Sequence, residues 1–401
     1  MKLLTIVNFI LSLGGLILFI PCLIFFIECF AAFLSSKSQV EIVNSDRPKT
    51  TILVPAHNEA EQIKEVLEGL LKQITERDRV IVIADNCHDN TAELARATGA
   101  TVLERENLIE RGKGYALDYA MKYIQDDPPE VMVVLDGDCI IEPDTIKRIT
   151  CKAIATGRPV QATYLMEQPE EPSLKDNVSM FSLKVKNLVR LLGLNRLGCH
   201  CLLTGSGMAF PWSLISQVSL AGSKTTDDMQ LTVDLALAGS TPVFCEDALV
   251  VGRLMKDQDA QSQRSRWEHG HLEMILVEVP RLLKEFVKTG RFAALVMALD
   301  LAIPPLSLLV MAWMVSIIVA WLAIIGGVSF TPAIIVTVAG AFLMTGVFLA
   351  WVKFGRSDLP WKNLIAIPFY ILSKIPIYLK FLVKPQSRWL KTERDNPNAN
   401  D

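Results

Sequence analysis

Three short clusters of polar residues stand where apolar runs end, and they are the first candidates for chemistry. They are Pro55–Glu59, Asp85–Asp89 and Asp136–Asp138. In open α/β sheets, ligands bind beside the carboxyl ends of the strands. One cluster alone is weak evidence, because polar residues after a strand usually form a turn or a helix cap. Three of them in one chain favour a site at strand ends.

The D-G-D cluster fits a metal ion best. The apolar run Val131–Leu135 presents Asp136 and Asp138 at the end of a strand. Two carboxylates there suit a hard divalent cation that also binds phosphate oxygens. The glycine between them lets a ligand approach the backbone closely. A second D-x-D, Asp257–Asp259, follows no apolar strand, so we assign it no role.

Two further motifs have both a structural and a functional interpretation. In Arg111–Gly114, Lys113 lies between two glycines at the expected start of a helix, where a phosphate can bind. On this motif alone a plain loop is the better interpretation. Thr226–Asp228 precedes the helical run 229–238, so its two acids fit either a helix cap favoured by the dipole or a general base.

A sixth motif combines an amide, a cation and an indole. It is the segment Gln263–Trp267. A solvated basic face would not need the tryptophan, so this combination favours a ligand.

Short runs rich in β-forming residues alternate with helical patterns over the middle of the chain. This alternation predicts an α/β domain with a mostly parallel sheet. The predicted strands are 51–54, 80–84, 101–103, 131–135 and 241–244. The predicted helices are 60–73, 90–98, 114–125 and 143–156.

Two long uncharged runs predict membrane-spanning helices. Residues 3–27 and 301–352 contain no charged side chain, and a helix needs about 20 apolar residues to cross a bilayer. Turn-forming residues at 326–332 divide the second run. We therefore expect one span in the first run and two in the second, near 301–325 and 333–352. A purely soluble protein is excluded, and so is a many-spanning transporter, because residues 37–290 are mixed in composition.

Basic residues lie on one side of these runs, which predicts the topology through the positive-inside rule. The N-terminus is expected outside a plasma (inner) membrane, and the large domain and the C-terminus in the cytoplasm. A cleaved signal peptide is the alternative for the first run, whose length favours an anchor. Residues 269–292 form an amphipathic pattern that we interpret as a helix in the membrane interface, and an ordinary core helix is the alternative. The expected divisions are an anchor at 1–36, a cytoplasmic domain at 37–268, an interfacial amphipathic helix at 269–292, two transmembrane helices at 293–353, and an interfacial segment with a cytoplasmic tail at 354–401.

Charge and cysteine content exclude other classes. The net charge is −3, and no basic patch suggests nucleic acid as a partner. The 8 cysteines are scattered, which fits reduced thiols better than a disulfide framework. Cys199-His200-Cys201 lacks a second ligand pair at zinc spacing, so we interpret it as small residues on a buried segment.

The order and spacing of these motifs resemble a known family. P-x-x-N-E, an Asp after the second strand, D-G-D, T-D-D and Q-x-x-R-W follow one another along the chain. This set resembles the membrane-bound family 2 glycosyltransferases, the group with hyaluronan, chitin, cellulose and poly-N-acetylglucosamine synthases. The resemblance covers the whole predicted cytoplasmic domain and the arrangement of anchors around it.

The resemblance implies a GT-A (Rossmann-like) fold, a nucleotide-sugar donor that is usually UDP-linked, and Mg²⁺ or Mn²⁺ as cofactor. Asp228 would be the general base, with Asp227 where many relatives have Glu, and Asp138 would bind the metal. The residues implied to bind the nucleotide-sugar are Pro55, Asn58, Glu59, Asp85, Lys113 and Asp136. The residues implied to contact the diphosphate and the acceptor are Gln263, Arg266, Trp267, Gly205 and Ser206. For the Thr204–Gly207 loop, a tight turn is an equally good interpretation.

The resemblance thus implies a metal-dependent inverting hexosyltransferase. It would transfer sugar from a UDP-sugar to a growing polysaccharide, with the lipid bilayer around its anchors and a possible export partner. Transfer of one sugar to a lipid-linked acceptor, without processivity, is the alternative. A non-catalytic membrane scaffold with the same fold is a third interpretation, and the intact set of acids argues against it.

Overall fold

The computed structural model describes residues 2–34, 47–168, 172–222, 226–253 and 257–383. The chain divides into two compact units, which we name the helical unit and the sheet unit. The cytoplasmic tail predicted at the C-terminus lies beyond the described residues. The helical unit contains Met1–Ser38, Glu170–His200 and His271–Lys384, and the sheet unit contains Gln39–Pro169, Cys201–Gly270 and Pro385–Asp401.

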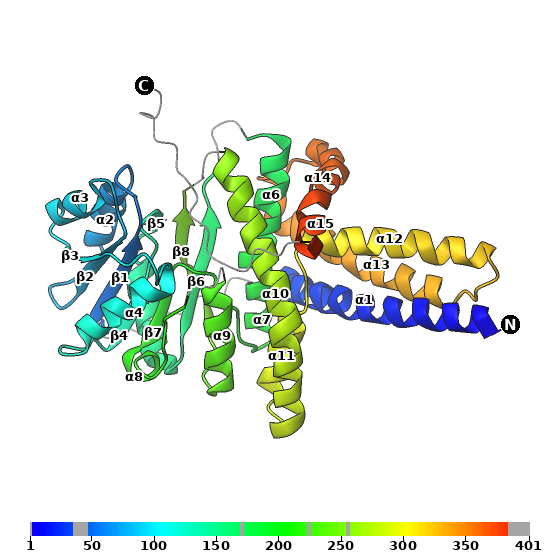
Figure 1. Cartoon of the computed structure of the whole chain (residues 1–401), viewed down its shortest axis with the longest axis horizontal. Coiled ribbons are helices and arrows are strands. Elements are labelled where there is room, and N and C mark those ends of the chain that lie inside the picture. Colours follow the sequence, from blue (N-terminus) through cyan, green and yellow to red (C-terminus); the bar gives the residue numbers. More distant parts are fainter. Residues whose placement is uncertain (1, 35–46, 169–171, 223–225, 254–256, 384–401) are drawn as a thin grey trace. The chain divides into compact units, whose positions relative to one another are not determined.

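The sheet unit is built on an eight-stranded sheet with the order β3-β2-β1-β4-β7-β6-β8-β5 (Figure 1). The first four of these strands are parallel to one another, so β1, β2 and β4 end at the same edge. That edge is where the three polar clusters follow, as their positions predict. The strands are β1 Thr50–Ala56, β2 Arg79–Asp85, β3 Thr101–Arg105, β4 Val131–Val134, β5 Cys139–Ile141, β6 Val160–Met166, β7 Met208–Pro211 and β8 Val243–Gly252.

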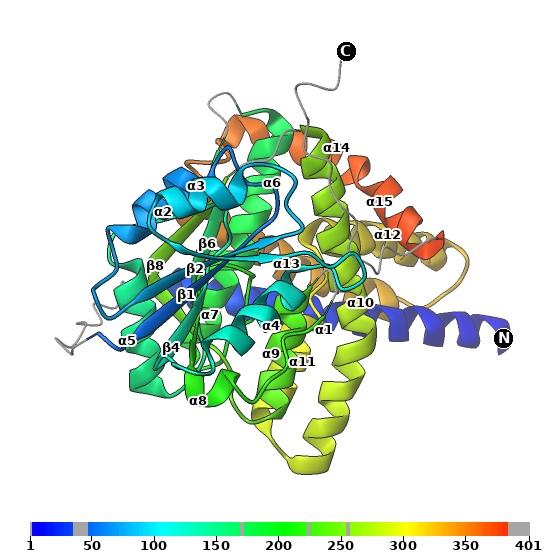
Figure 2. The same ribbon diagram turned by 60° about the vertical axis from the view of Figure 1, so that its left-hand side comes forward.

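Helices cover both faces of this sheet, because its central strands carry apolar side chains on both sides (Figure 2). Ile52 and Val54 of β1 face one core with α2, α3 and α5. Leu53 faces the other core with α4, α8 and α9. The helices are α2 Ile63–Leu71, α3 Thr91–Ala97, α4 Lys113–Ile124, α5 Thr145–Thr156, α8 Trp212–Ile215 and α9 Asp227–Leu237.

The α/β class is confirmed, but the sheet is mixed where the sequence predicted a mostly parallel one. Strand β7 is antiparallel to β4 and β6, and β5 is antiparallel to β8. Strand β5 begins at Cys139, directly after the D-G-D turn that follows β4. A parallel crossover needs a dozen or more residues, so β5 cannot pair in parallel with β4, and it pairs antiparallel with β8 instead. The strand predicted at 241–244 begins later and runs to Gly252, and β5, β6 and β7 were not predicted.

The helical unit contains three helices that are long and apolar enough to cross a membrane, judged by length and composition. They are Lys2–Leu34, Leu306–Ile325 and Thr331–Gly355. The second begins later than the predicted 301, because Pro304 and Pro305 separate it from a short helix, α11. Proline lacks the amide hydrogen that a continuous helix needs. The helices named here are α1 Lys2–Leu34, α11 Phe292–Leu301, α12 Leu306–Ile325 and α13 Thr331–Ala350.

Helix α1 packs along α13 within this unit (Figure 1). Small residues permit close approach: a Cβ on Gly15 would lie 3.2 Å from Ile335, and one on Gly346 would lie 3.0 Å from Phe25. The Phe26 and Phe342 rings are 5.1 Å apart. Close packing around glycine is typical of helices that associate in lipid.

A buried ion triad joins three segments of the helical unit. Arg190 Nε donates to Glu28 Oε2 at 2.7 Å, and the same guanidinium donates to a carboxylate oxygen of Asp300 and, at 2.9 Å, to its carbonyl oxygen. Two acids thus share one buried cation. The remaining segments of this unit are α6 Leu174–Lys184, η1 Val185–Arg190, α7 Leu191–Arg196, η2 Trp351–Gly355, η3 Trp361–Ala366, α14 Ile367–Ser373 and α15 Ile375–Val383. Helix α10 Asp257–Thr289 belongs to the sheet unit up to Gly270 and to the helical unit from His271.

Candidate active site

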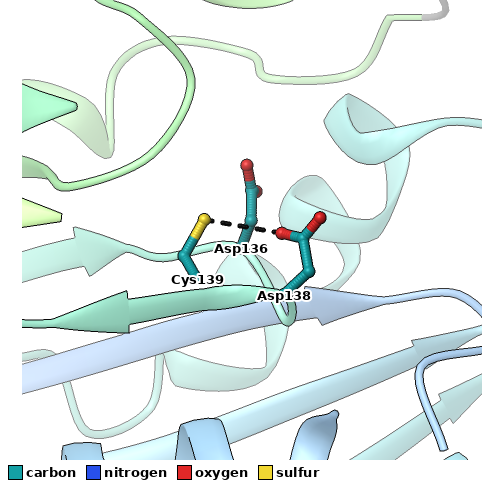
Figure 3. A group of neighbouring side chains, drawn as sticks. All are labelled: Asp136, Asp138 and Cys139. Carbon is teal, nitrogen blue, oxygen red and sulfur yellow. Dashed lines mark hydrogen bonds between the residues drawn. The ribbon is translucent and has the colours of Figure 1, made fainter. Parts of the chain in front are cut away.

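The D-G-D turn forms an acidic cluster at the end of β4. Ligand atoms of Asp136, Asp138 and Cys139 all lie within 4.8 Å of one another, so the three could hold a metal ion. Figure 3 shows the three side chains on the same side of the turn, with Cys139 Sγ 3.4 Å from Asp138 Oδ1. The sequence reasoning predicted both acids and missed the cysteine, although its place directly after the motif was a usable signal.

Burial governs the protonation of this cluster. It raises the pKa of Asp136, an effect that Lys113 opposes and Asp138 reinforces. Burial, with the charges of Asp138 and Asp136, raises the pKa of the Cys139 thiol well above its ordinary value. The pKa of Tyr164, whose hydroxyl lies 4.0 Å from the Cys139 sulfur, is raised well above its ordinary value, mainly by burial. A bound cation would offset the cost of ionising these groups.

Lys113 connects the D-G-D turn to a second loop. Its ammonium donates to Asp136 Oδ1 and, at 2.6 Å, to the carbonyl oxygen of Gly205. Burial opposes its charge, but the carboxylates of Asp136 and Asp228 outweigh this and raise the pKa of Lys113. The plain-loop interpretation of this motif is therefore insufficient, because the lysine is a cross-link between two parts of the site.

The Thr204–Gly207 loop combines both interpretations that its sequence allowed. It is a tight turn, with φ of 98° at Gly205 and 70° at Gly207, values that favour glycine. It also lies in the site, because Ser206 Oγ accepts a hydrogen bond of 3.0 Å from the Asp136 amide. A Cβ on Gly205 would lie 3.6 Å from Asp228 Oδ2.

The two acids of T-D-D face different neighbours at the start of α9. Asp228 Oδ2 lies beside Gly205, whereas Asp227 Oδ1 would be 3.6 Å from a Cβ on Gly222. Thr232 anchors this helix start, because its hydroxyl donates to the Asp228 carbonyl at 2.9 Å and accepts from the Leu203 amide at 2.9 Å. Asp228 Oδ2 thus lies beside the loop that contacts the D-G-D turn.

The P-x-x-N-E cluster lies next to the D-G-D turn, since β1 and β4 are neighbours. A Cβ on Gly137 would lie 3.4 Å from the Pro55 carbonyl and 3.5 Å from Glu59 Cγ. Asn58 has φ of 57°, and its side-chain oxygen accepts from the His88 amide at 2.8 Å. The Asn58 side chain thus joins the loops that follow β1 and β2.

Asp85 has a partner that no motif indicated. Arg105 Nη1 donates to Asp85 Oδ1 at 2.7 Å, and both side chains are nearly buried. The two residues stand at the ends of the paired strands β2 and β3. The Arg105 guanidinium also lies 5.9 Å from the ring centre of Tyr115. Arg105 belongs to none of the sequence motifs and lies 20 residues from Asp85 along the chain, so no signal in the sequence indicated this pair.

The Q-x-x-R-W residues lie in the first part of α10. Arg266 is buried, and Gln263 and Trp267 are half-buried. Their expected role over the diphosphate and acceptor remains a prediction.

A comparison with protein families identifies the fold that carries this cluster. A family model described as glycosyltransferase like family 2 matches residues 48–270, which is more than half of the chain. The chain belongs to this family. The match covers the whole of the sheet from β1 to β8, so the glycosyltransferase domain includes every site residue described above.

Curated relatives of this glycosyltransferase match over short segments. An uncharacterised protein of Methanocaldococcus jannaschii is 28% identical over 120 residues, 30% of this chain and 47% of that protein. Glycosyltransferase AglE of Haloferax volcanii is 26% identical over 117 residues, 29% of this chain and 38% of AglE. The 4,4′-diaponeurosporenoate glycosyltransferase of Staphylococcus aureus is 34% identical over 82 residues, 20% of this chain and 21% of that enzyme. The chain thus spans less than half the length of each of these relatives.

A solved structure resembles nearly the whole glycosyltransferase chain. The mannosyltransferase PcManGT from Pyrobaculum calidifontis, in complex with GDP-Man and Mn²⁺, aligns with a TM-score of 0.57 at 19% identity. The alignment covers 94% of this chain and 100% of that one. This likeness shows the shared fold, an α/β GT-A-like glycosyltransferase fold with a mixed sheet.

Proposed function

We propose that the protein is a membrane-anchored, metal-dependent glycosyltransferase that takes its sugar from a nucleotide-sugar. The observation that carries this proposal is the arrangement at the sheet edge. Two carboxylates suited to a cation, Asp136 and Asp138, are joined through Lys113 and Gly205 to a further acid, Asp228. Transfer from a sugar diphosphate requires both elements: positive charge beside the leaving group and a base beside the attacking hydroxyl.

Asp85 and Arg105 support a donor with a keto nucleobase. Together they present a carboxylate acceptor beside guanidinium donors. Uracil and guanine each offer the complementary pair, a ring N–H next to a carbonyl oxygen, whereas adenine offers neither in that arrangement. We favour a UDP-sugar, bound also by Pro55, Asn58 and Glu59, with a GDP-sugar as the alternative that the same pair would accept.

Asp138, with Asp136, would hold Mg²⁺ or Mn²⁺. Carboxylate oxygens are the ligands that both cations prefer, and the bound cation would neutralise charge on the departing diphosphate. Arg266, Gln263 and Trp267 are proposed to close over the diphosphate and the acceptor sugar. A guanidinium binds diphosphate oxygens, and an indole gives a sugar ring a flat apolar surface.

Asp228 is proposed as the general base of an inverting transfer. It would accept the proton of the acceptor hydroxyl while that oxygen attacks the anomeric carbon from the face opposite the diphosphate. Asp228 suits this role because it faces Gly205, beside the loop that contacts Asp136.

The helical unit is proposed to sit in a plasma (inner) membrane, with the sheet unit in the cytoplasm. Its three candidate spans support this. The end of α10 and α11 run across the direction of α1, α12 and α13 (Figures 1 and 2), as an interfacial segment does. Exposed Leu276, Val277 and Val287 alternate there with exposed basic residues. Single-cysteine labelling from outside should reach the 326–332 turn but not the end of α10; the reverse pattern would reject this topology.

Two acceptors fit this proposal. A growing polysaccharide is the one that the resemblance to polymer synthases favours. A lipid-linked acceptor that receives one sugar is favoured by the number of candidate spans among the described residues, which is three. The size of the product separates the two.

The test is an assay of the purified full chain in detergent with Mn²⁺ and a panel of radiolabelled UDP-sugars and GDP-mannose. Transfer of label to polymer or to extractable lipid is the expected result. Asp138→Asn should abolish transfer and weaken UDP binding in Mn²⁺ but not in EDTA. Asp259→Asn, in the D-x-D copy within α10, is the matched control and should retain activity. Full wild-type activity in EDTA would reject the metal role, and no transfer or hydrolysis of any donor would reject the proposed function.

A further inference from the structure

A buried glutamine that no motif indicated holds the Thr204–Gly207 loop. Gln161, in β6, is fully buried. Its side-chain oxygen accepts from the Thr204 amide at 2.8 Å, and its side-chain nitrogen donates to the Ser206 carbonyl at 2.9 Å and the Ala162 carbonyl at 2.8 Å. One side chain thus satisfies backbone groups on both sides of Gly205. Such a bidentate clamp fixes the conformation of a loop that contains two flexible glycines.

Gln161 contacts the loop from β6, and two other groups contact it from the side of the D-G-D turn. The Asp136 amide donates to Ser206 Oγ at 3.0 Å, and Lys113 donates to the Gly205 carbonyl at 2.6 Å. Gln161, Lys113 and the Asp136 amide therefore hold this loop, together with backbone bonds of Gly207 to Val134 at 3.0 Å and to Ala162 at 2.9 Å. At Gly205 the loop lies beside Asp228 Oδ2. The loop therefore contacts both the D-G-D turn, proposed for the diphosphate, and Asp228, proposed for the attacking hydroxyl.

We propose that Gln161 is a positioning residue for the acceptor, acting through the Gly205 backbone. This inference rests on the proposed function. The reacting hydroxyl must lie between the anomeric carbon and Asp228, and the Gly205 segment borders that space. Displacement of a reacting group by about 1 Å can cost about 10²-fold in rate. A water molecule does not need the Gly205 segment to orient it. Hydrolysis of the donor should therefore tolerate a displaced loop far better than sugar transfer does.

The test compares Gln161→Glu and Gln161→Met with wild type, using the donor and acceptor that the wild type uses in the assay above. Gln161→Glu keeps the acceptor for the Thr204 amide but places a second oxygen against the Ser206 carbonyl. We expect UDP affinity and donor hydrolysis within about twofold of wild type, and acceptor KM raised at least about tenfold, the scale of a partial displacement. At acid pH the introduced carboxyl group is protonated and can donate to that carbonyl again, so the acceptor KM of Gln161→Glu should move back toward that of wild type.

Gln73→Glu is the matched control. Gln73 also donates to backbone carbonyls, those of Ile141 at 3.4 Å and Glu142 at 2.9 Å, at the end of β5 opposite to the D-G-D turn. Gln73→Glu should lower the melting temperature and leave the transfer kinetics unchanged. If Gln161→Met and Gln161→Glu lower the melting temperature while acceptor KM and the ratio of hydrolysis to transfer stay at wild-type values, the residue is merely structural and the inference is wrong. If UDP affinity falls together with the transfer rate, Gln161 belongs to the donor site, and the inference is also wrong. A wild-type protein without any activity would overturn the proposed function itself.

Discussion

Replacing Asp228 by Asn separates chemistry from folding at the proposed base. The folding cost should be limited, because the Thr232 hydroxyl that anchors the start of α9 stays in place and asparagine has nearly the size and shape of aspartate. The substitution removes one charge from a helix N-terminus, where a carboxylate stabilises by about 0.3–1 kcal/mol. The folding cost should therefore stay at or below about 1 kcal/mol.

The expected catalytic cost is larger. Loss of a general base lowers a rate by about 10²–10⁴-fold, which is about 2.7–5.4 kcal/mol of activation free energy at 1.36 kcal/mol per tenfold. Donor binding should change little, because the nucleotide is proposed to bind at Asp85 and the cation at Asp138, whereas Asp228 is proposed to contact the acceptor hydroxyl. Asp228→Asn should thus bind UDP as the wild type does and transfer sugar at least about a hundredfold more slowly.

The assay pairs UDP affinity by calorimetry with initial transfer rates, and Asp227→Asn is the control. Asp227 faces Gly222 rather than Gly205, so its loss should be milder. If Asp227→Asn is inactive and Asp228→Asn active, the base has been assigned to the wrong acid. If both variants lose UDP affinity, the pair belongs to the donor site and the base lies elsewhere.

Three further predictions concern stability and loop placement. Arg190→Met leaves two buried carboxylates without their cation and should cost about 3–5 kcal/mol, whereas Glu28→Gln leaves a balanced pair and should cost far less; equal losses of melting temperature in detergent would contradict this account of the triad. Burial, with the charges of Lys186 and Arg190, lowers the pKa of His271 to about 3. The unfolded chain binds that proton near pH 6.5, so the free energy of unfolding falls as pH drops below 6.5, by about 2 kcal/mol at pH 5. His271→Gln should flatten this dependence of stability on pH, and an unchanged dependence would show that His271 does not cause it. Gly114→Ala should lower transfer, because its Cβ would strike the backbone of the segment before α9; wild-type kinetics would show that this segment is free to move.

Much of the site could be predicted from sequence because its signals are local. A carboxylate pair after an apolar strand, as at Asp136 and Asp138, depends only on the pleat and on where the strand ends. The parallel pairing of β1, β2 and β4 follows from the helices between them, which are long enough for crossovers. These local rules placed three polar clusters at one edge, and the structure confirms that edge.

Sequence reasoning failed where a partner comes from far along the chain. The resemblance implied that Lys113 binds the nucleotide-sugar, but its motif alone gave no sign of its partners, Asp136 and Gly205. Asp85 and Arg105 meet only because β2 and β3 pair in register. Strands β5 and β7 were missed because they contain only 3 and 4 residues. Strand β6, with 7 residues, was also not predicted.

The sequence by itself determined the α/β alternation, the uncharged runs that form three candidate spans, and the acids at strand ends, since each depends on periodicity, run length or adjacent residues. Only the tertiary structure decided that the sheet is mixed, that Arg190 gathers two buried acids, and that Gln161 clamps the loop facing Asp228. The physical reason is that a buried polar group must find a partner at hydrogen-bond distance. Which partner it finds depends on strand order and helix packing across the whole chain, and no local pattern encodes that choice.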